Sequence, residues 1–222
     1  MRNFLQENKD RDIRVSIEPG LLLTNKNGYK LTIDGKQWMT YSPNGLSQEK
    51  EFASSVDLAY GKCVLSGLGL GILPGMLLKN PKVTSITVYE ISKQVIEMNR
   101  TYGESFKKIK VINQSIRDAR NIECDCLLLD HYEHESDEYI VDDVSEISHN
   151  NNAKCIWFWR AEPMIAHFKN MSKSDSIQRA YEAWAASTGI RNLPNLTEQQ
   201  LNYYIGLWDI ANYNRNKKIN GA

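Results

Sequence analysis

The chain has 222 residues, of which 41% are hydrophobic and 24% are charged, and these values are ordinary for a single globular domain. The chain has 27 basic and 27 acidic residues. This balance disfavours strong non-specific binding to nucleic acid, because such binding needs an excess of basic residues. No apolar run approaches the roughly 20 residues that span a bilayer, so we expect no transmembrane helix. The N-terminal segment MRNFLQENKDRD has no apolar stretch behind its charges, so we expect no secretory signal.

Residues 13–41 alternate short apolar segments with turn residues. The dipeptides Asn27-Gly28 and Asp34-Gly35 favour tight hairpin turns, because both suit positive φ. The pattern predicts an antiparallel meander of about three strands, at residues 21–24, 29–33 and 36–41. We assign this meander to an N-terminal unit of residues 1–45.

From residue 46 to residue 165, near-continuous apolar strands alternate with helices. We expect strands at residues 63–66, 85–91, 109–113, 126–129 and 153–159. We expect one helix at residues 48–60, a short second helix that follows the first of these strands and ends at about residue 79, and a third helix at residues 93–102. Apolar strands that alternate with helices are typical of a parallel sheet covered on both faces. The predicted fold class is α/β: a Rossmann-like, doubly wound, mostly parallel sheet with an N-terminal antiparallel β meander and C-terminal helices.

The C-terminal unit, residues 166–222, contains two predicted helices. Ser174 or Asp175 caps the first, and a capping box of Thr197 and Gln200 begins the second. Residues 214–222 are predicted to form a polar tail.

A glycine-rich turn, Gly67-Leu68-Gly69-Leu70-Gly71, follows the first predicted parallel strand. Glycines at such a turn let a ligand approach the backbone closely, and the helix that follows offers free N–H groups. The dinucleotide-binding pattern G-x-G-x-x-G is incomplete, because Ile72 stands at the position of its third glycine. The P-loop pattern is absent as well. Glu90 ends the second strand about twenty residues downstream, where an acidic residue can accept hydrogen bonds from ribose hydroxyls. These residues predict a nucleoside-binding site.

With these features, the sequence resembles the class I S-adenosylmethionine-dependent methyltransferase fold, and within it the spermidine synthase-like branch. The resemblance covers residues 31–161. LTIDGKQWMTY is similar to the L-x-L-D-G-x-x-Q segment of the branch, with Gln37 displaced by one position. NPKVTSITVYEISKQVIE is similar to its second-strand region, and CDCLLLDHYEH to its fourth strand and D-x-x-D-P loop. The order and spacing of these segments carry the resemblance.

The resemblance implies S-adenosylmethionine as cofactor and transfer of a methyl group to a small molecule or another, unidentified acceptor. It implies cofactor contacts at Gly67, Leu68, Gly69, Gly71, Glu90, Ile91, Ser115, Ile116 and Asp130. The candidates for catalysis are Asp130, His131 and Glu133, any of which could accept a proton from a hydroxyl or amine acceptor. Relatives of this branch often pair through their N-terminal strands, so a homodimer is an open alternative.

Several positions depart from the pattern of the branch. Leu70 stands where polyamine-forming enzymes have an aspartate, and Glu133 replaces the second aspartate of a D-x-x-D-P loop that also lacks its proline, which disfavours aminopropyl transfer. Leu65 stands where many methyltransferases have an acidic residue for the methionine end of the cofactor, and Ser115 stands where an acidic adenine contact is usual. Two alternatives therefore stay open: a spermidine synthase-like aminopropyltransferase, and a degenerate, non-catalytic protein that binds the cofactor or a partner.

The sequence predicts neither a metal site nor a disulfide framework. His131 and His134 form an H-x-x-H pair, but no clear further ligand follows them. The four cysteines lack the paired spacing of a zinc site. They are predicted to be buried, reduced thiols, which are typical of a cytoplasmic protein, and they are Cys63, Cys124, Cys126 and Cys155.

Overall fold

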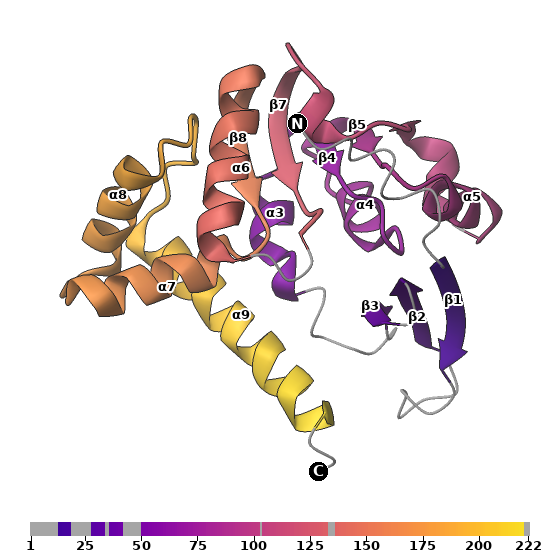
Figure 1. Ribbon diagram of the computed structural model, residues 1–222. Coiled ribbons are helices and arrows are strands. Elements are labelled where there is room, and N and C mark those ends of the chain that lie inside the picture. The colour runs from indigo at the N-terminus through magenta and orange to yellow at the C-terminus, as the bar shows by residue number, and fades with distance from the viewer. Residues whose placement is uncertain are drawn as a thin grey trace.

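The computed structural model describes residues 13–18, 28–33, 36–41, 50–102, 104–132 and 136–219 (Figure 1). Its N-terminal strands, β1 (Ile13–Glu18), β2 (Gly28–Ile33) and β3 (Lys36–Tyr41), form an antiparallel sheet in the order β1-β2-β3. The predicted meander is therefore confirmed, although its first strand is β1. The strand predicted at residues 21–24 lies outside the described residues.

A second, five-stranded sheet is parallel throughout and has the order β6-β5-β4-β7-β8. Because the order reverses between β4 and β7, the chain builds this sheet outward in both directions, as the predicted doubly wound class requires. The strands are β4 (Gly61–Ser66), β5 (Val83–Tyr89), β6 (Lys110–Ile112), β7 (Glu123–Leu129) and β8 (Asn152–Phe158).

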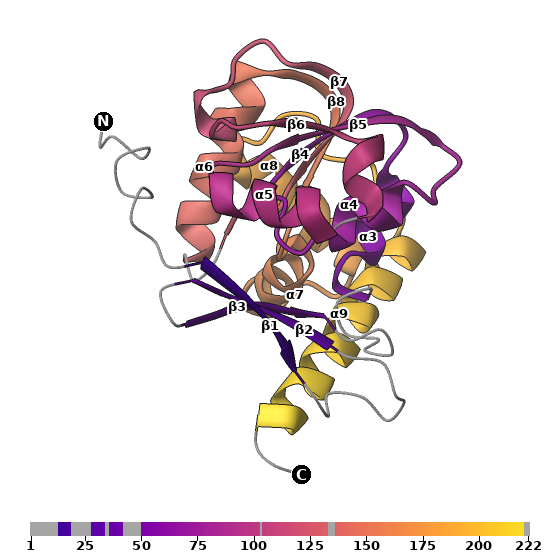
Figure 2. The same cartoon turned by 90° about the vertical axis from the view of Figure 1, so that its right-hand side faces the viewer.

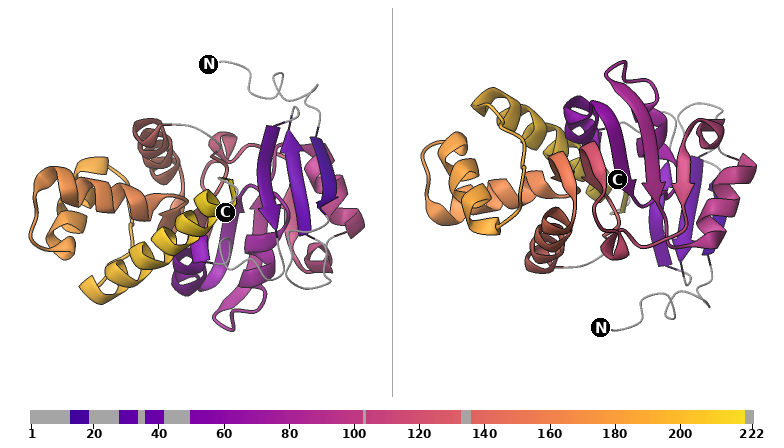
Figure 3. Two further views of the ribbon diagram at one scale, coloured as in Figure 1. Left: turned by 90° about the horizontal axis from the view of Figure 1, so that it is seen from below. Right: turned by 90° about the horizontal axis from the view of Figure 1, so that it is seen from above.

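Helices flank the parallel sheet (Figure 3). Right-handed crossovers that run in opposite directions from a central strand place their helices on opposite faces of a sheet. α3 (Ala53–Leu58) precedes β4, α4 (Ile72–Leu77) joins β4 to β5, and α5 (Lys93–Tyr102) with η1 (Glu104–Lys108) joins β5 to β6. The turn η2 (Ile116–Asp118) lies between β6 and β7, and α6 (Asp137–Asn150) joins β7 to β8.

The chain ends in α7 (Ala161–Ser172), α8 (Ile177–Thr188) and α9 (Glu198–Ile219). The capping box that predicts α9 is present, since Thr197 N donates to Gln200 Oε1 at 3.0 Å and Gln200 N donates to Thr197 Oγ1 at 3.3 Å. The predicted polar tail is wrong through residue 219, where α9 continues. Packing of Leu201 and Trp208 fixes the start of this helix, and each added residue then costs little.

The parallel sheet carries the core and presents one functional edge. Leu127 and Ile156 are fully buried on the adjacent strands β7 and β8. Because all five strands run the same way, the residues that follow them gather at their carboxyl ends. β3 of the N-terminal sheet reaches this edge, where Leu70 N donates to Met39 Sδ at 3.4 Å (Figure 2). The division of the chain at residues 45 and 165 stays a prediction.

Candidate functional site

The glycine turn after β4 has the left-handed backbone that its sequence predicts. Gly67, Gly69 and Gly71 have φ values of +83°, +49° and +73°. At Gly67 a Cβ atom would overlap the backbone carbonyl oxygen of Asp130, and at Gly71 it would lie 2.8 Å from Asn99 Oδ1. The left-handed backbone therefore favours glycine at both positions, and at Gly67 the close approach of the Asp130 backbone requires it.

Glu90 joins this turn to the end of β5. Its Oε2 accepts a hydrogen bond from Leu68 N at 2.8 Å, and its Oε1 accepts one from Ser92 N at 2.7 Å. The side chain is buried, and burial raises the pKa of Glu90 although the backbone donors act in the opposite direction. Asn113 Nδ2 donates to the carbonyl oxygens of Glu90 and Ile91, each at 2.9 Å, and so fixes the end of the strand.

Ser115 and Ile116 follow β6 at the same edge of the sheet, and both are buried. The Ser115 hydroxyl caps η2, because its Oγ accepts a hydrogen bond from Arg117 N at 3.2 Å. The hydroxyl can accept a second hydrogen bond, so its capping role leaves room for a contact with a ligand. The structure therefore brings the predicted contacts after β4, β5 and β6 together on three adjacent strands.

Asp130 follows β7 and lies next to the glycine turn. Its backbone N–H donates to Ser66 O at 3.2 Å and to Ser66 Oγ at 3.1 Å, which ties it to the end of β4. Burial and the charge of Glu51 raise the pKa of Asp130 to about 7. A carboxyl group with such a pKa can both accept and release a proton near neutral pH.

A second buried carboxyl group, Glu162 at the start of α7, belongs to this acidic region. Ser54 Oγ donates to Glu162 Oε1, and Trp157 Nε1 donates to Ser54 Oγ at 2.8 Å. Burial raises the pKa of Glu162 to about 7, and the charge of Glu51 contributes in the same direction. Sequence reasoning missed Glu51 and Glu162, because neither lies in a recognisable motif.

His131 lies between two strong hydrogen-bond partners. Ser66 Oγ is 2.6 Å from its Nδ1, and Asp143 Oδ2 is 3.1 Å from its Nε2. The order Ser-His-Asp resembles a hydrolase triad, but Ser66 is only 1% exposed and already accepts a hydrogen bond from Asp130 N. A nucleophile must be accessible to its substrate, so this network positions the loop after β7. Glu133 lies outside the described residues, and its predicted role stays a prediction.

Three observations bear on other classes of site. Within residues 13–18, 28–33, 36–41, 50–102, 104–132 and 136–219, no group of three or more His, Cys, Asp or Glu side chains could hold a metal ion. All four cysteines are free in the structure, and all four are buried, as the sequence predicts for them. None of the described helices has both the length and the apolar character needed to cross a membrane.

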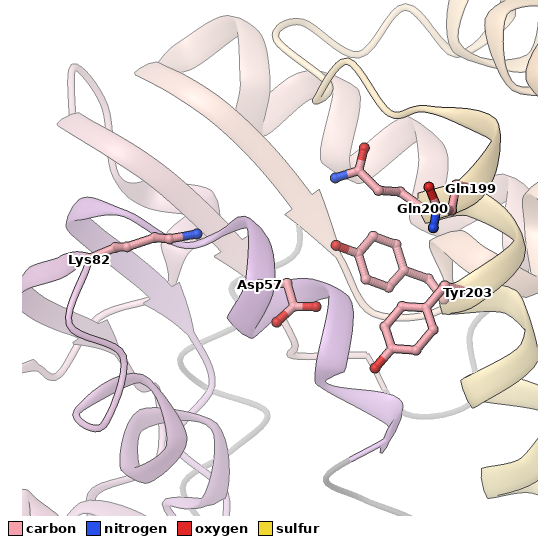
Figure 4. Close-up of a pocket in the computed structure, with 6 residues that line it drawn as sticks. Asp57, Lys82, Gln199, Gln200 and Tyr203 are labelled. Atoms are coloured by element: carbon pink, nitrogen blue, oxygen red, sulfur yellow. The ribbon is translucent and has the colours of Figure 1, made fainter.

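A pocket of about 410 Å³ lies at the amino end of the parallel strands (Figure 4). Lys82 precedes β5, whereas Glu90 follows it, so this pocket and the glycine turn are at opposite ends of the sheet. Its lining is polar and comes from α3, α9 and the turn before β5: Asp57, Lys82, Gln199, Gln200, Tyr203 and Tyr204.

Comparison with solved structures identifies the fold. The spermidine synthase from Thermotoga maritima superposes with a TM-score of 0.50 and 15% sequence identity, over 74% of this chain and 60% of that one. This chain is similar in fold to a spermidine synthase. The resemblance expected from the sequence is thus confirmed at the level of the fold.

Two further solved structures are similar over smaller parts of the chain. A probable spermidine synthase from Corynebacterium glutamicum has a TM-score of 0.45 and 10% identity, over 62% of this chain and 57% of that one. An S-adenosylmethionine-dependent methyltransferase from Clostridium acetobutylicum has a TM-score of 0.35 and 18% identity, over 48% of this chain and 46% of that one. The chain thus spans 57% and 60% of the lengths of the two spermidine synthases. No protein-family model and no curated protein sequence matches the chain.

Proposed function

We propose that this chain binds S-adenosylmethionine and transfers its methyl group to an acceptor that is still to be identified. The observation that carries the proposal is the junction of the glycine turn, Glu90 and Asp130 at the carboxyl ends of β4, β5 and β7. In doubly wound sheets, ligands bind where the strand order reverses, which here is between β4 and β7.

The residues of this junction fit the nucleoside part of the cofactor. The carboxylate oxygens of Glu90 accept backbone N–H groups, among them those of Leu68 and Ser92, and their four lone-pair positions leave room for a ribose hydroxyl. The Leu70 N–H has the Met39 thioether as its hydrogen-bond partner, a weak acceptor that a ligand oxygen can replace. The left-handed glycines keep Cβ atoms out of the turn, so a ligand can approach its backbone.

When bound, the cofactor supplies an electrophilic methyl group on a sulfonium. The chain's contribution is to hold the ribose through Glu90, to place an acceptor beside Asp130, and to take up the proton that the acceptor releases. Positioning supplies much of the acceleration in such a transfer. Because its pKa is about 7, the Asp130 carboxylate is a proton acceptor suited to neutral pH.

Replacing Glu90 by glutamine should weaken S-adenosylmethionine binding about ten- to a hundred-fold, because an amide gives a weaker hydrogen bond to a hydroxyl than a carboxylate does. Titration calorimetry measures this change. The matched control is Glu97→Gln, which removes a charge on the exposed side of α5 and should leave the affinity unchanged. Equal affinity in the wild type and the Glu90 variant would remove Glu90 from the site.

The rate of transfer should rise as the pH increases through about 7, because Asp130 accepts protons only when ionised. In Asp130→Asn this rise should disappear and the rate should fall about a hundred- to a thousand-fold. A pH–rate profile at saturating cofactor measures both effects. A wild-type rate that does not change between pH 6 and pH 8 would show that Asp130 is not the base.

The decisive test of the activity identifies the nucleoside product after incubation with candidate hydroxyl and amine acceptors. Methyl transfer predicts S-adenosylhomocysteine from S-adenosylmethionine. Formation of methylthioadenosine from decarboxylated cofactor would instead favour the aminopropyltransferase alternative, and binding without any product would favour the non-catalytic one. The homodimer and the cytoplasmic location stay predictions.

A further inference from the structure

The carboxylate of Asp143 on α6 is the centre of a partly buried hydrogen-bond network that the proposed chemistry does not use. Arg117 Nε donates to its Oδ1 at 2.6 Å, while His131 Nε2 at 3.1 Å and Tyr132 Oη at 2.9 Å donate to its Oδ2. Burial opposes ionisation, but the hydrogen bonds from His131 and Arg117 outweigh it and hold the pKa of Asp143 below its ordinary value. Asp143 is therefore an anion that accepts three hydrogen bonds.

One arm of this network leads from Asp143 to Asp130. When His131 is neutral and donates from Nε2, its lone pair is on Nδ1, and Nδ1 then accepts the Ser66 hydroxyl proton across the 2.6 Å contact. The Ser66 Oγ lone pairs then face the Asp130 N–H, which donates to this atom at 3.1 Å. The charge of Asp143 thus selects the imidazole tautomer that accepts the Ser66 hydroxyl proton and so orients the side chain that contacts Asp130 N.

The other arm leads from Asp143 to the turn after β6. Arg117 and Asp143 form an ion pair whose side chains are 19% and 10% exposed, so water screens it only partly. The backbone N–H of Arg117 donates to the Ser115 hydroxyl, which caps η2. Asp143 therefore connects the turn predicted to contact the nucleoside with the loop that carries the proposed base.

We infer that Asp143 is a positioning residue of the proposed transferase site, which it serves by holding His131 in the Nε2–H tautomer and Arg117 against η2. The part of the inference that concerns the effect of Asp143 on cofactor binding rests on the proposed function. The effect of Asp143 on the tautomer of His131 is independent of the proposed function.

Asp143→Asn keeps the size of the side chain but removes this control. If the amide oxygen faces Arg117, the amide NH₂ faces His131, which must then carry its proton on Nδ1. Nδ1–H would donate to Ser66 Oγ, and the Ser66 hydroxyl proton would have to turn away from His131. The other orientation of the amide places two donors, Arg117 Nε and the amide NH₂, against each other.

The test combines two measurements on the full chain. Long-range ¹H–¹⁵N NMR of the histidine rings reports the tautomer of His131, and calorimetry with S-adenosylhomocysteine reports the affinity. Asp143→Asn should move the His131 proton to Nδ1 and weaken binding about tenfold. Asp142→Asn, an exposed neighbour on the same helix, should change neither. Tyr132→Phe removes one donor to Asp143 but should keep the Nε2–H tautomer.

A wild-type His131 that carries a proton on Nδ1, with or without one on Nε2, overturns the inference, and this result does not depend on whether any variant folds. An Asp143→Asn protein with wild-type tautomer and affinity overturns it as well. If the wild type does not bind S-adenosylhomocysteine but Asp143→Asn still changes the tautomer, the proposed function fails while the link between Asp143 and His131 is confirmed.

Discussion

Glu162→Gln should stabilise the protein by about 3 kcal/mol at pH 8 and change its stability little below pH 4.5. The pKa of Glu162 in the folded protein is about 7, against an ordinary value of 4.5, and each unit of difference corresponds to about 1.4 kcal/mol. Glutamine is close to glutamate in size, cannot ionise, and can still accept the hydrogen bond from Ser54 Oγ. The free energy of unfolding in urea, measured from pH 4 to pH 8, tests this prediction.

The direction of this effect follows from the raised pKa. A carboxyl group whose pKa is higher in the folded state binds its proton more tightly there, so its contribution to stability is complete below pH 4.5 and is lost as the pH rises through about 7. The wild type therefore loses stability over this range and the glutamine variant does not. Glu182→Gln, at an exposed position of α8, is the control for replacing a glutamate by glutamine at a site outside the buried acidic region. If the difference between wild type and Glu162→Gln did not vary with pH, folding would not raise the pKa of Glu162.

Gly67→Ala should destabilise the fold by about 3 kcal/mol and abolish cofactor binding. Gly67 has φ +83°, a conformation that is unfavourable for alanine, and the added Cβ would overlap the Asp130 carbonyl oxygen. Because that atom belongs to the backbone immediately after β7, relief requires the ends of β4 and β7 to move apart at the site. Urea unfolding and calorimetry with S-adenosylhomocysteine measure the two losses.

Gly206→Ala is the matched control for the glycine turn. Gly206 lies within α9, and a Cβ built there has no neighbour within 4 Å. Alanine is a better helix former than glycine, so this change should stabilise the protein by about 0.5–1 kcal/mol. If both alanine variants gave the same stability, the proposed close packing of Gly67 against Asp130 would be wrong.

The parallel sheet could be predicted because its strands are short apolar runs that end in informative residues. Glycine spacing after β4 and an acidic residue after β5 locate the carboxyl ends of the strands, where a doubly wound sheet binds its ligand. Helix α6 was missed although its signals are present: Ser136 Oγ accepts from Tyr139 N at 3.3 Å as the N-cap, and Ile140 and Val144 share the buried face. Polar residues around these positions obscured the helical periodicity.

The electrostatics of the site could not be predicted, because they arise from contacts between distant segments. Glu51 and Glu162 are far apart in the sequence, yet the charge of Glu51 affects the pKa of Glu162. Asp143 gains its role only when α6 packs beside His131 and Arg117. No local pattern encodes these pairings, whereas the glycine turn is encoded by its own spacing.

Titration of the wild-type chain with S-adenosylmethionine and S-adenosylhomocysteine tests the central claim most directly. We expect saturable binding, with a rise in melting temperature of about 5–10 °C when the ligand is at about 100 times its Kd. Glu90→Gln should lose about half of this rise or more at the same ligand concentration, whereas Glu97→Gln should keep it. The absence of both heat and stabilisation with either ligand would contradict the proposal that the glycine turn and Glu90 form an S-adenosylmethionine site.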